Sequence, residues 1–145
     1  MRWALAIAVA VFAAASQASD VGQIKTLRGS VHVERDGQRI AAGSGMNVRQ
    51  ADVLVTGADG AVGVTFLDNS LLSLGPDSRL AIDRYSFDST THAGQFDASL
   101  KKGTLAVVSG KMVKQSPDAM RVRTPSSIMG VRGTEFVVQV GEPVR

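Results

Sequence analysis

Short runs of alternating apolar and polar residues, interrupted by glycine, constrain the fold of this 145-residue chain more than any other feature. The clearest run is Ala61 to Phe66, in which Val62, Val64 and Phe66 would share one face of a strand. Beyond the N-terminal segment, no stretch of ten or more residues repeats its apolar residues at the helical period. All 15 glycines follow the N-terminal segment, and they lie where alternating runs stop. The pattern predicts an all-β fold of many short strands and tight turns.

Four segments share a pattern in which glycine and a small residue are followed by valine at the fifth position. They span residues 29–33, 60–64, 103–107 and 133–137. The intervals between them are irregular, which excludes a strict solenoid repeat. A loosely wound β-coil or a rolled stack of two sheets remains, with a β-sandwich or jelly roll as the alternative.

Turn-forming residues indicate where the strands lie. Asp36-Gly37 is typical of a two-residue hairpin turn, so strands are expected on both sides of it, with His32 pointing away from the valine face. The side chains of Asp68–Ser70 and Gly75–Ser78 favour two further turns. The other expected elements are strands at 71–74, 80–87, 96–100 and 104–109, the last two separated by Lys101-Lys102-Gly103, and loops at 88–94 and 110–119.

The stretch from Met120 to Val140 looks like the least replaceable part of the sequence. Residues 121–124 alternate as a half-buried strand does, and Pro125 keeps the preceding residue extended, so the strand should end at this proline. Gly130 and Gly133 suggest a backbone that takes positive φ or passes close to another segment. Alternation then resumes from Phe136, which predicts a second strand.

Two interpretations of this stretch are open. In the structural one its residues serve the fold: Thr124, Pro125, Gly130 and Gly133 shape a corner, Ile128 and Phe136 fill the core, Thr134 bonds backbone, and Arg132 pairs with Glu135 or another carboxylate. In the functional one Arg121, Arg123 and Arg132 present a cationic surface to a partner, because guanidinium groups suit carboxylates.

Residues 1–18 have the pattern of a secretory signal peptide. Arg2 precedes an apolar run from Ala4 to Ala15, and Ser16-Gln17-Ala18 supplies small residues for a cleavage site. The run is too short and too rich in alanine to suit a membrane anchor. We therefore expect cleavage after Ala18, a periplasmic or secreted location, a single domain at 19–145 and no membrane span after cleavage.

The sequence offers no pattern for catalysis or metal binding. The absence of cysteine excludes disulfides, thiolate zinc sites and a cysteine nucleophile. The two histidines, His32 and His92, are far apart in the chain, and Gly43-Ser44-Gly45 does not have the nucleophile-elbow pattern. The turn aspartates do not have the spacing of a calcium loop. We predict no enzymatic activity and no cofactor.

Basic residues are concentrated in the last third of the chain. Residues 19–100 carry 7 basic and 10 acidic side chains, whereas residues 101–145 carry 8 basic and 3 acidic ones. Because export would separate the chain from nucleic acid, we do not expect a nucleic-acid partner. The basic end is either a solvated strand face or an electropositive patch for an acidic protein or anionic envelope polymer.

The segment Thr124–Phe136 resembles the closing signature of the FecR domain, a periplasmic β-rich module. Upstream, Gly29–Gly37, Val53–Val62 and Asp68–Leu80 follow in the order that this family shows, so that the resemblance covers residues 22–140. It implies a β-solenoid-like or rolled two-sheet FecR fold.

The resemblance also implies a non-catalytic protein-interaction or signalling module, accessory to an envelope sensor. Membrane-spanning FecR-type regulators relay a signal from an outer-membrane iron-siderophore receptor to a sigma factor inside the cell. This sequence shows no counterpart of their sigma-binding helices, membrane span or receptor-docking domain. We therefore expect an unidentified periplasmic or membrane protein as partner, without direct contact to a sigma factor. The alternative is a binder of peptidoglycan or another anionic glycan, whose binding would weaken as salt rises.

Overall fold

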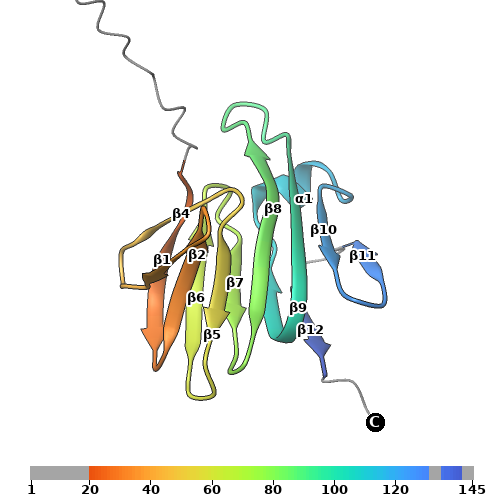
Figure 1. Ribbon diagram of the computed structural model, residues 1–145. Helices are drawn as coiled ribbons and strands as arrows, with labels where there is room; N and C mark the ends of the chain where they lie inside the picture. The colour runs from red at the N-terminus through yellow and green to blue at the C-terminus, as the bar shows by residue number, and fades with distance from the viewer. Residues whose placement is uncertain (1–19, 131–134, 142–145) are drawn as a thin grey trace, which may run out of the picture.

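The computed structural model describes residues 20–130 and 135–141, which form one strongly curled, mostly antiparallel half-barrel (Figure 1). Strands account for 61% of the described residues and helix for 4%, which confirms the all-β prediction. The expected signal peptide lies outside the described residues. The elements are β1 (Asp20–Arg28), β2 (Val31–Arg35), β3 (Gln38–Ala41), β4 (Asn47–Arg49), β5 (Val53–Thr56), β6 (Ala61–Phe66), β7 (Leu71–Leu74), β8 (Arg79–Phe87), β9 (Gly94–Val108), α1 (Lys111–Gln115), β10 (Met120–Arg123), β11 (Ile128–Gly130) and β12 (Glu135–Val140).

The half-barrel consists of two layers that share the long strand β9. The β8 layer contains β3, β2, β5, β8, the first half of β9, β10 and β11. The β7 layer contains β4, β1, β6, β7, the second half of β9 and β12. Among the described residues the one parallel pairing joins β9 to β10, so the arrangement is a rolled antiparallel sheet and not a parallel solenoid.

β9 is a single strand of 15 residues, whereas the sequence predicted two strands separated by Lys101-Lys102-Gly103. That prediction was wrong because the glycine bends the strand without ending it. Gly103 has φ +96°, and a side chain there would collide with Ser78. The amide of Thr104 donates a hydrogen bond of 3.0 Å to Ser78 Oγ, which fixes the bend at the point where β9 passes from one layer to the other.

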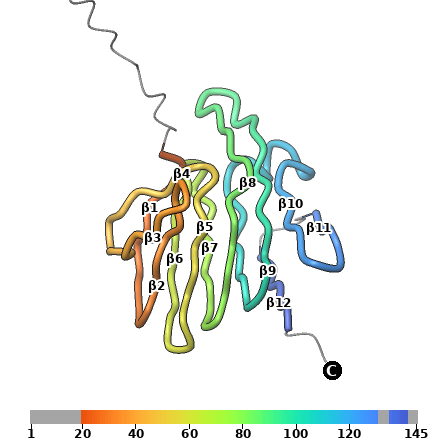
Figure 2. The backbone as a smooth tube through the Cα atoms, in the orientation of Figure 1, coloured from red at the N-terminus to blue at the C-terminus, as the bar shows by residue number. Residues whose placement is uncertain are grey.

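The chain crosses between the layers at a row of corners that lie side by side along the lower edge in Figure 2. The amide of Gly57 donates to the carbonyl of Ser30 at 2.8 Å, and the amide of Asp77 donates to the carbonyl of Gly57 at 3.0 Å. The amide of Gly75 continues the row by donating to the carbonyl of Thr104 at 3.0 Å. Three of the four glycine-led segments noted in the sequence begin at these corners, at residues 29, 60 and 103.

The inner faces of the two layers share one hydrophobic core. Val62, Val64 and Phe66 point into it with 2–3% exposure, as their alternation predicts. Phe66, Tyr85 and Phe96 form an aromatic cluster with ring centroids 4.7–5.4 Å apart. The cluster joins β6 to β8 and to the first half of β9, and so holds the two layers together.

Two predicted turns are confirmed in detail. Asp36 and Gly37 both have positive φ between β2 and β3, as a two-residue hairpin turn requires. In the second turn the carboxylate of Asp68 accepts hydrogen bonds from the amide and the hydroxyl of Ser70. It also accepts one of 3.0 Å from the hydroxyl of Tyr85. Burial raises the pKa of Tyr85, so this phenol stays a donor.

The predicted loop at 110–119 contains the helix α1, with Met112 and Val113 buried. A helix of five residues is too short to show a helical period in the sequence, and the burial of its two apolar side chains stabilises it. Within the part of the chain that the structure describes, no helix has the length and hydropathy of a transmembrane segment.

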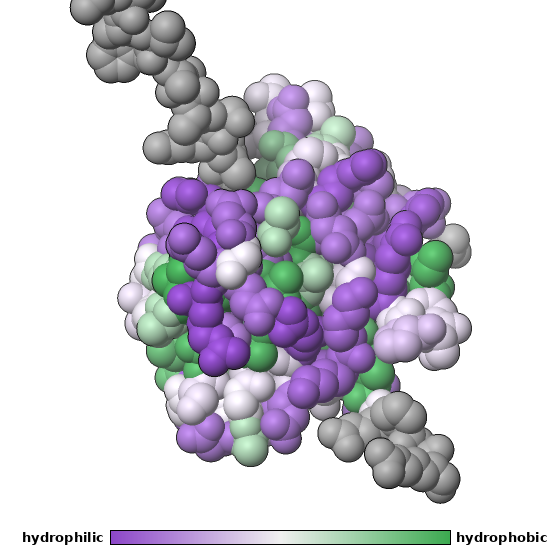
Figure 3. Space-filling view, viewed as in Figure 1, coloured by the Kyte–Doolittle hydropathy of each residue, from purple (hydrophilic) through white to green (hydrophobic). Residues whose placement is uncertain are grey.

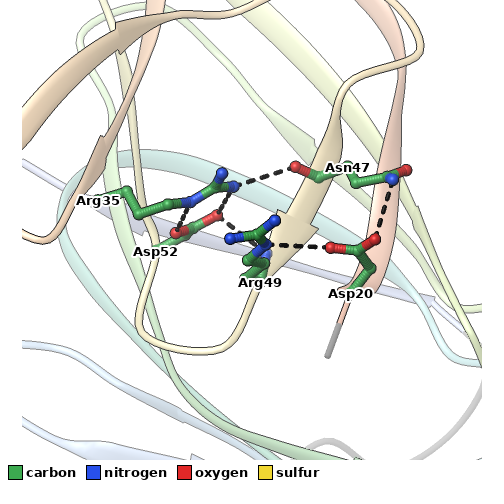
Figure 4. A network of polar contacts seen from close by, with 5 residues as sticks. All are labelled: Asp20, Arg35, Asn47, Arg49 and Asp52. Atoms are coloured by element: carbon green, nitrogen blue, oxygen red, sulfur yellow. Dashed lines mark hydrogen bonds and ion pairs between the residues drawn. The ribbon is translucent and has the colours of Figure 1, made fainter. Parts of the chain in front are cut away.

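A polar network ties the N-terminal strands together (Figure 4). The buried carboxylate of Asp52 accepts hydrogen bonds from Arg35 Nε and Nη2 at 2.9 and 2.7 Å and from the amide of Arg49 at 2.9 Å. Arg35 also donates to the carbonyl of Asn47, and Arg49 Nε donates to Asp20 at 3.2 Å. Hydrogen bonding to Asp52 raises the pKa of Arg35, which keeps its guanidinium charged.

Candidate functional site

Arg121 and Arg123, two of the predicted partner-binding arginines, lie on the outer face of β10 and are exposed. They alternate with buried residues, and β10 pairs with β9 so that Arg121 lies opposite Asp97 and Arg123 opposite Ser99. Neither guanidinium forms an ion pair with another described residue. The third predicted arginine, Arg132, lies outside the described residues.

A groove of about 700 Å³ adjoins Arg123 on the outer face of the β8 layer. Serine and glutamine side chains donate hydrogen bonds to its two carboxylates, Asp83 and Asp97. Neither carboxylate forms an ion pair with Lys101 or Arg123. With Arg84, the described lining carries three cations and two carboxylates, which leaves it with a net positive charge. The lining residues are Asp83, Arg84, Asp97, Ser99, Leu100, Lys101, Arg123, Thr124 and Pro125. Figure 3 shows hydrophilic side chains over β8 and β9 on this side of the molecule.

A second hollow, of about 750 Å³, lies between the end of β10 and the end of β12, and we call it the β10–β12 notch. Both strands pair with the same side of β9, β10 as far as Ser99 and β12 from Gly103 onward. The notch lies beside the part of β9 between these two pairings. Its lining residues are Lys101, Lys102, Thr124, Pro125, Ser126, Ser127, Met129, Val138, Gln139, Val140 and Gly141.

The turn from Thr124 to Ser127 forms one wall of the notch and also borders the groove. The amide of Thr124 donates to the carbonyl of Ser127 at 2.8 Å, and the amide of Ser127 donates to Thr124 Oγ1 at 3.1 Å. β10 ends at Arg123, as the sequence predicted from Pro125. The closed turn holds this proline between the two hollows, both of which it lines.

Two predictions for the closing stretch were wrong. Gly130 lies within the strand β11, its φ is not positive, and a side chain there would meet open space. Ile128 was expected in the core but is 62% exposed. The reason is that β11 is an edge strand paired only with β10 among the described residues, and Ile128 lies opposite the outward-facing Arg123. Phe136 does pack against the core, while Gly133 and Thr134 lie outside the described residues.

The two histidines do not contact each other. His32 is on the outer face of β2, with its Nε2 3.7 Å from Glu34 Oε1. His92 lies in the loop at 88–94, where its ring stacks on Phe87 with centroids 6.0 Å apart. In residues 20–130 and 135–141 there is no group of three or more histidine, aspartate and glutamate side chains that could hold a metal ion.

The sequence did not reveal the role of Lys101 and Lys102. They were expected in a connection between two strands, whereas they are exposed residues of β9 that line the notch. Two adjacent lysines before a glycine were the available signal, but the notch itself is made by segments far apart in the sequence. Its apolar part comes from Met129, Val138 and Val140.

The comparisons with known proteins bear on this part of the chain. Neither the curated proteins nor the solved structures gave a match. The model of the FecR protein family matches residues 52–144, which begin at the buried Asp52 and leave out β1 to β4. The expected similarity of Gly29–Gly37 thus lies outside the matched range. The match covers more than half of the 145 residues and includes the groove, the notch and the β10 arginines, so the chain belongs to the FecR family.

Proposed function

We propose that this protein is a non-catalytic periplasmic interaction module, accessory to an envelope signalling complex, that binds an acidic surface of a partner protein. The FecR domain links the chain to FecR-type signalling, and the family is non-catalytic in general. The periplasmic location rests on the signal-peptide pattern of residues 1–18.

The observation that carries the proposal is the set of exposed cations Lys101, Arg121 and Arg123, which have no ion-pair partner among the described residues. They project from paired strands, so little backbone ordering would be lost on binding. Arginine in such a position suits a carboxylate, to which it can donate two parallel hydrogen bonds.

An anionic envelope polymer is the second candidate, because the same cations would attract it. Sugar recognition commonly uses exposed aromatic rings. The rings of Phe66, Tyr85 and Phe96 are instead buried at 1–5% exposure. We therefore favour an acidic protein as the partner.

The test is to place a photo-crosslinking residue at position 124 of the full chain in living cells, which leaves both β10 arginines in place. We expect a discrete protein adduct that becomes several-fold weaker when Arg121→Glu is added, because the reversed charge repels an acidic surface. The matched control is Arg39→Glu, which makes the same charge change at an exposed position on β3.

Two results would overturn this proposal. Adducts formed only with peptidoglycan, and lost as salt rises, would establish the polymer binder instead. An adduct equally strong in the Arg121→Glu and Arg39→Glu backgrounds would show that the β10 arginines do not select the partner.

A further inference from the structure

Within the part of the chain that the structure describes, the β10–β12 notch leaves a stretch of strand edge unpaired. On one side of β9, pairing with β8 continues to Lys102. On the other side, pairing with β10 ends at Ser99 and pairing with β12 starts at Gly103, so that no strand of the described residues pairs with residues 100–102 there. An open strand edge can accept an extended peptide by main-chain hydrogen bonding.

The polar groups around this edge favour an anion. Lys101 and Lys102 are both exposed, and no described carboxylate pairs with either. Among the described residues that line the notch, none is acidic. Ser126 adds a hydroxyl group for which the structure shows no hydrogen bond to a described residue, and Gln139 adds an amide.

The rest of the lining is apolar. Val138 is 5% exposed and belongs to the core, while Met129 and Val140 are half-buried and pack against it. Pro125 completes this lining from the turn after β10. An aliphatic side chain could therefore be buried beside the lysines, and methionine adapts well to side chains of different shape.

The length of the gap determines which part of a peptide fits. Three residues of β9 correspond to about 10 Å of strand, and the ends of β10 and β12 close the gap on both sides. A peptide that continued in both directions would have to turn out of the notch twice. A peptide whose C-terminus lies in the notch would leave it in one direction only. Its terminal carboxylate would then be placed beside the lysines.

From this geometry we propose that the β10–β12 notch binds the C-terminus of a partner protein, with its terminal carboxylate on Lys101 and Lys102 and an aliphatic side chain against Met129, Val138 and Val140. The inference rests on the proposed function and specifies the chemistry of the partner. It assigns the notch a contact separate from that of the β10 arginines.

The test uses the full chain without residues 1–18 and a library of short peptides with random C-terminal residues and a free carboxylate. We expect the selected peptides to end in an aliphatic residue, and their affinity to fall about tenfold or more when the terminus is amidated. The double variant Lys101→Gln/Lys102→Gln should cause a similar loss. Its matched control is Lys111→Gln/Lys114→Gln, which removes the same charge from exposed positions of α1.

A second variant tests the notch without changing its charge. Ser126→Trp adds a large side chain at an exposed position of the turn and should block the selected peptides while the melting temperature stays that of the wild type.

The possible results separate this inference from the proposed function. If amidated peptides bind as well as free acids, or no peptide is selected, while the crosslink at position 124 persists, the C-terminal inference is wrong and the proposed function stands. If both the peptide selection and the crosslink fail, both are wrong.

Discussion

The outer face of the β8 layer has two halves that differ in whether their arginines form ion pairs. In the half made by β2, β5 and β8, Arg79 donates hydrogen bonds from both Nη1 and Nη2 to the carboxylate of Glu34. In the half made by β9 and β10, Arg121 and Arg123 have no ion-pair partner among the described residues. Successive strand pairings place Glu34 and Arg123 in one row across the sheet, so both lie on the same face of it.

The difference indicates which charged side chains stabilise the fold. The pairs on the β2 side connect strands that are adjacent only after folding, so their loss should lower stability. The β10 arginines contribute no such connection, and stability alone does not explain why two of them stand on a short strand. Substitutions on both sides of the sheet test this contrast, and the first of them is in β9, the strand that joins the two halves to the β7 layer.

The largest loss should come from Gly103→Val, which forces a β-branched residue into positive φ and against Ser78 at the bend of β9. We expect the free energy of unfolding to fall by about 4 kcal/mol or more, measured by urea denaturation. Gly130→Val is the matched control, because residue 130 has neither positive φ nor a close neighbour. Equal stability of the two variants would show that the bend does not need glycine.

Next comes Asp52→Ala, which breaks the network at the N-terminal strands. The carboxylate of Asp52 is 1% exposed, and its removal leaves the partly buried guanidinium of Arg35 without its ion partner. The expected cost is about 3 kcal/mol, as for other pairs in which one buried partner is removed. Thermal unfolding of Asp52→Ala and of the exposed Asp83→Ala would measure it. A comparable loss in both variants would contradict the distinction between the network and the surface carboxylates.

Local patterns in the sequence were sufficient to predict most of the fold. Alternation predicted β6 and the inward direction of Val62 and Val64, and Asp36-Gly37 predicted the β2–β3 hairpin. The path of β9 was not predictable in this way. Gly103 bends the strand because Ser78 lies against it, and that contact joins segments about 25 residues apart.

The candidate site shows the same limit. Alternation along β10 was enough to expect Arg121 and Arg123 on one face, and Pro125 was enough to end the strand. The exposure of Ile128 depends on β11 being an edge strand, which only the pairing of strands reveals. The notch depends on where β10 and β12 stop along β9, so no local pattern could indicate it.

A smaller effect is expected from Arg79→Ala, and it should depend on pH. The hydrogen bonds from Arg79 lower the pKa of Glu34 below its usual 4.5. The pair therefore stabilises the fold above that pH, and its contribution is lost as the pH falls through the lowered pKa. The difference in melting temperature between wild type and Arg79→Ala should thus narrow on acidification. The pKa of Asp88 is also lowered, but by the amides of Thr90 and Thr91, so its titration should be the same in both proteins. A difference that stays constant across this range would mean that the ion pair is not its cause.

The smallest effect on stability should come from Arg123→Ala. Its guanidinium is exposed and unpaired among the described residues, so the change in the free energy of unfolding should stay within about 0.5 kcal/mol. The same variant should lose the partner contact, because a charge that does not serve the fold remains available for binding. Measuring urea unfolding together with crosslinking from a neighbouring position, 124, separates the two properties. A destabilised Arg123→Ala protein would mean that the guanidinium stabilises the fold. A stable protein that still forms the adduct would mean that the β10 arginines have no role in binding.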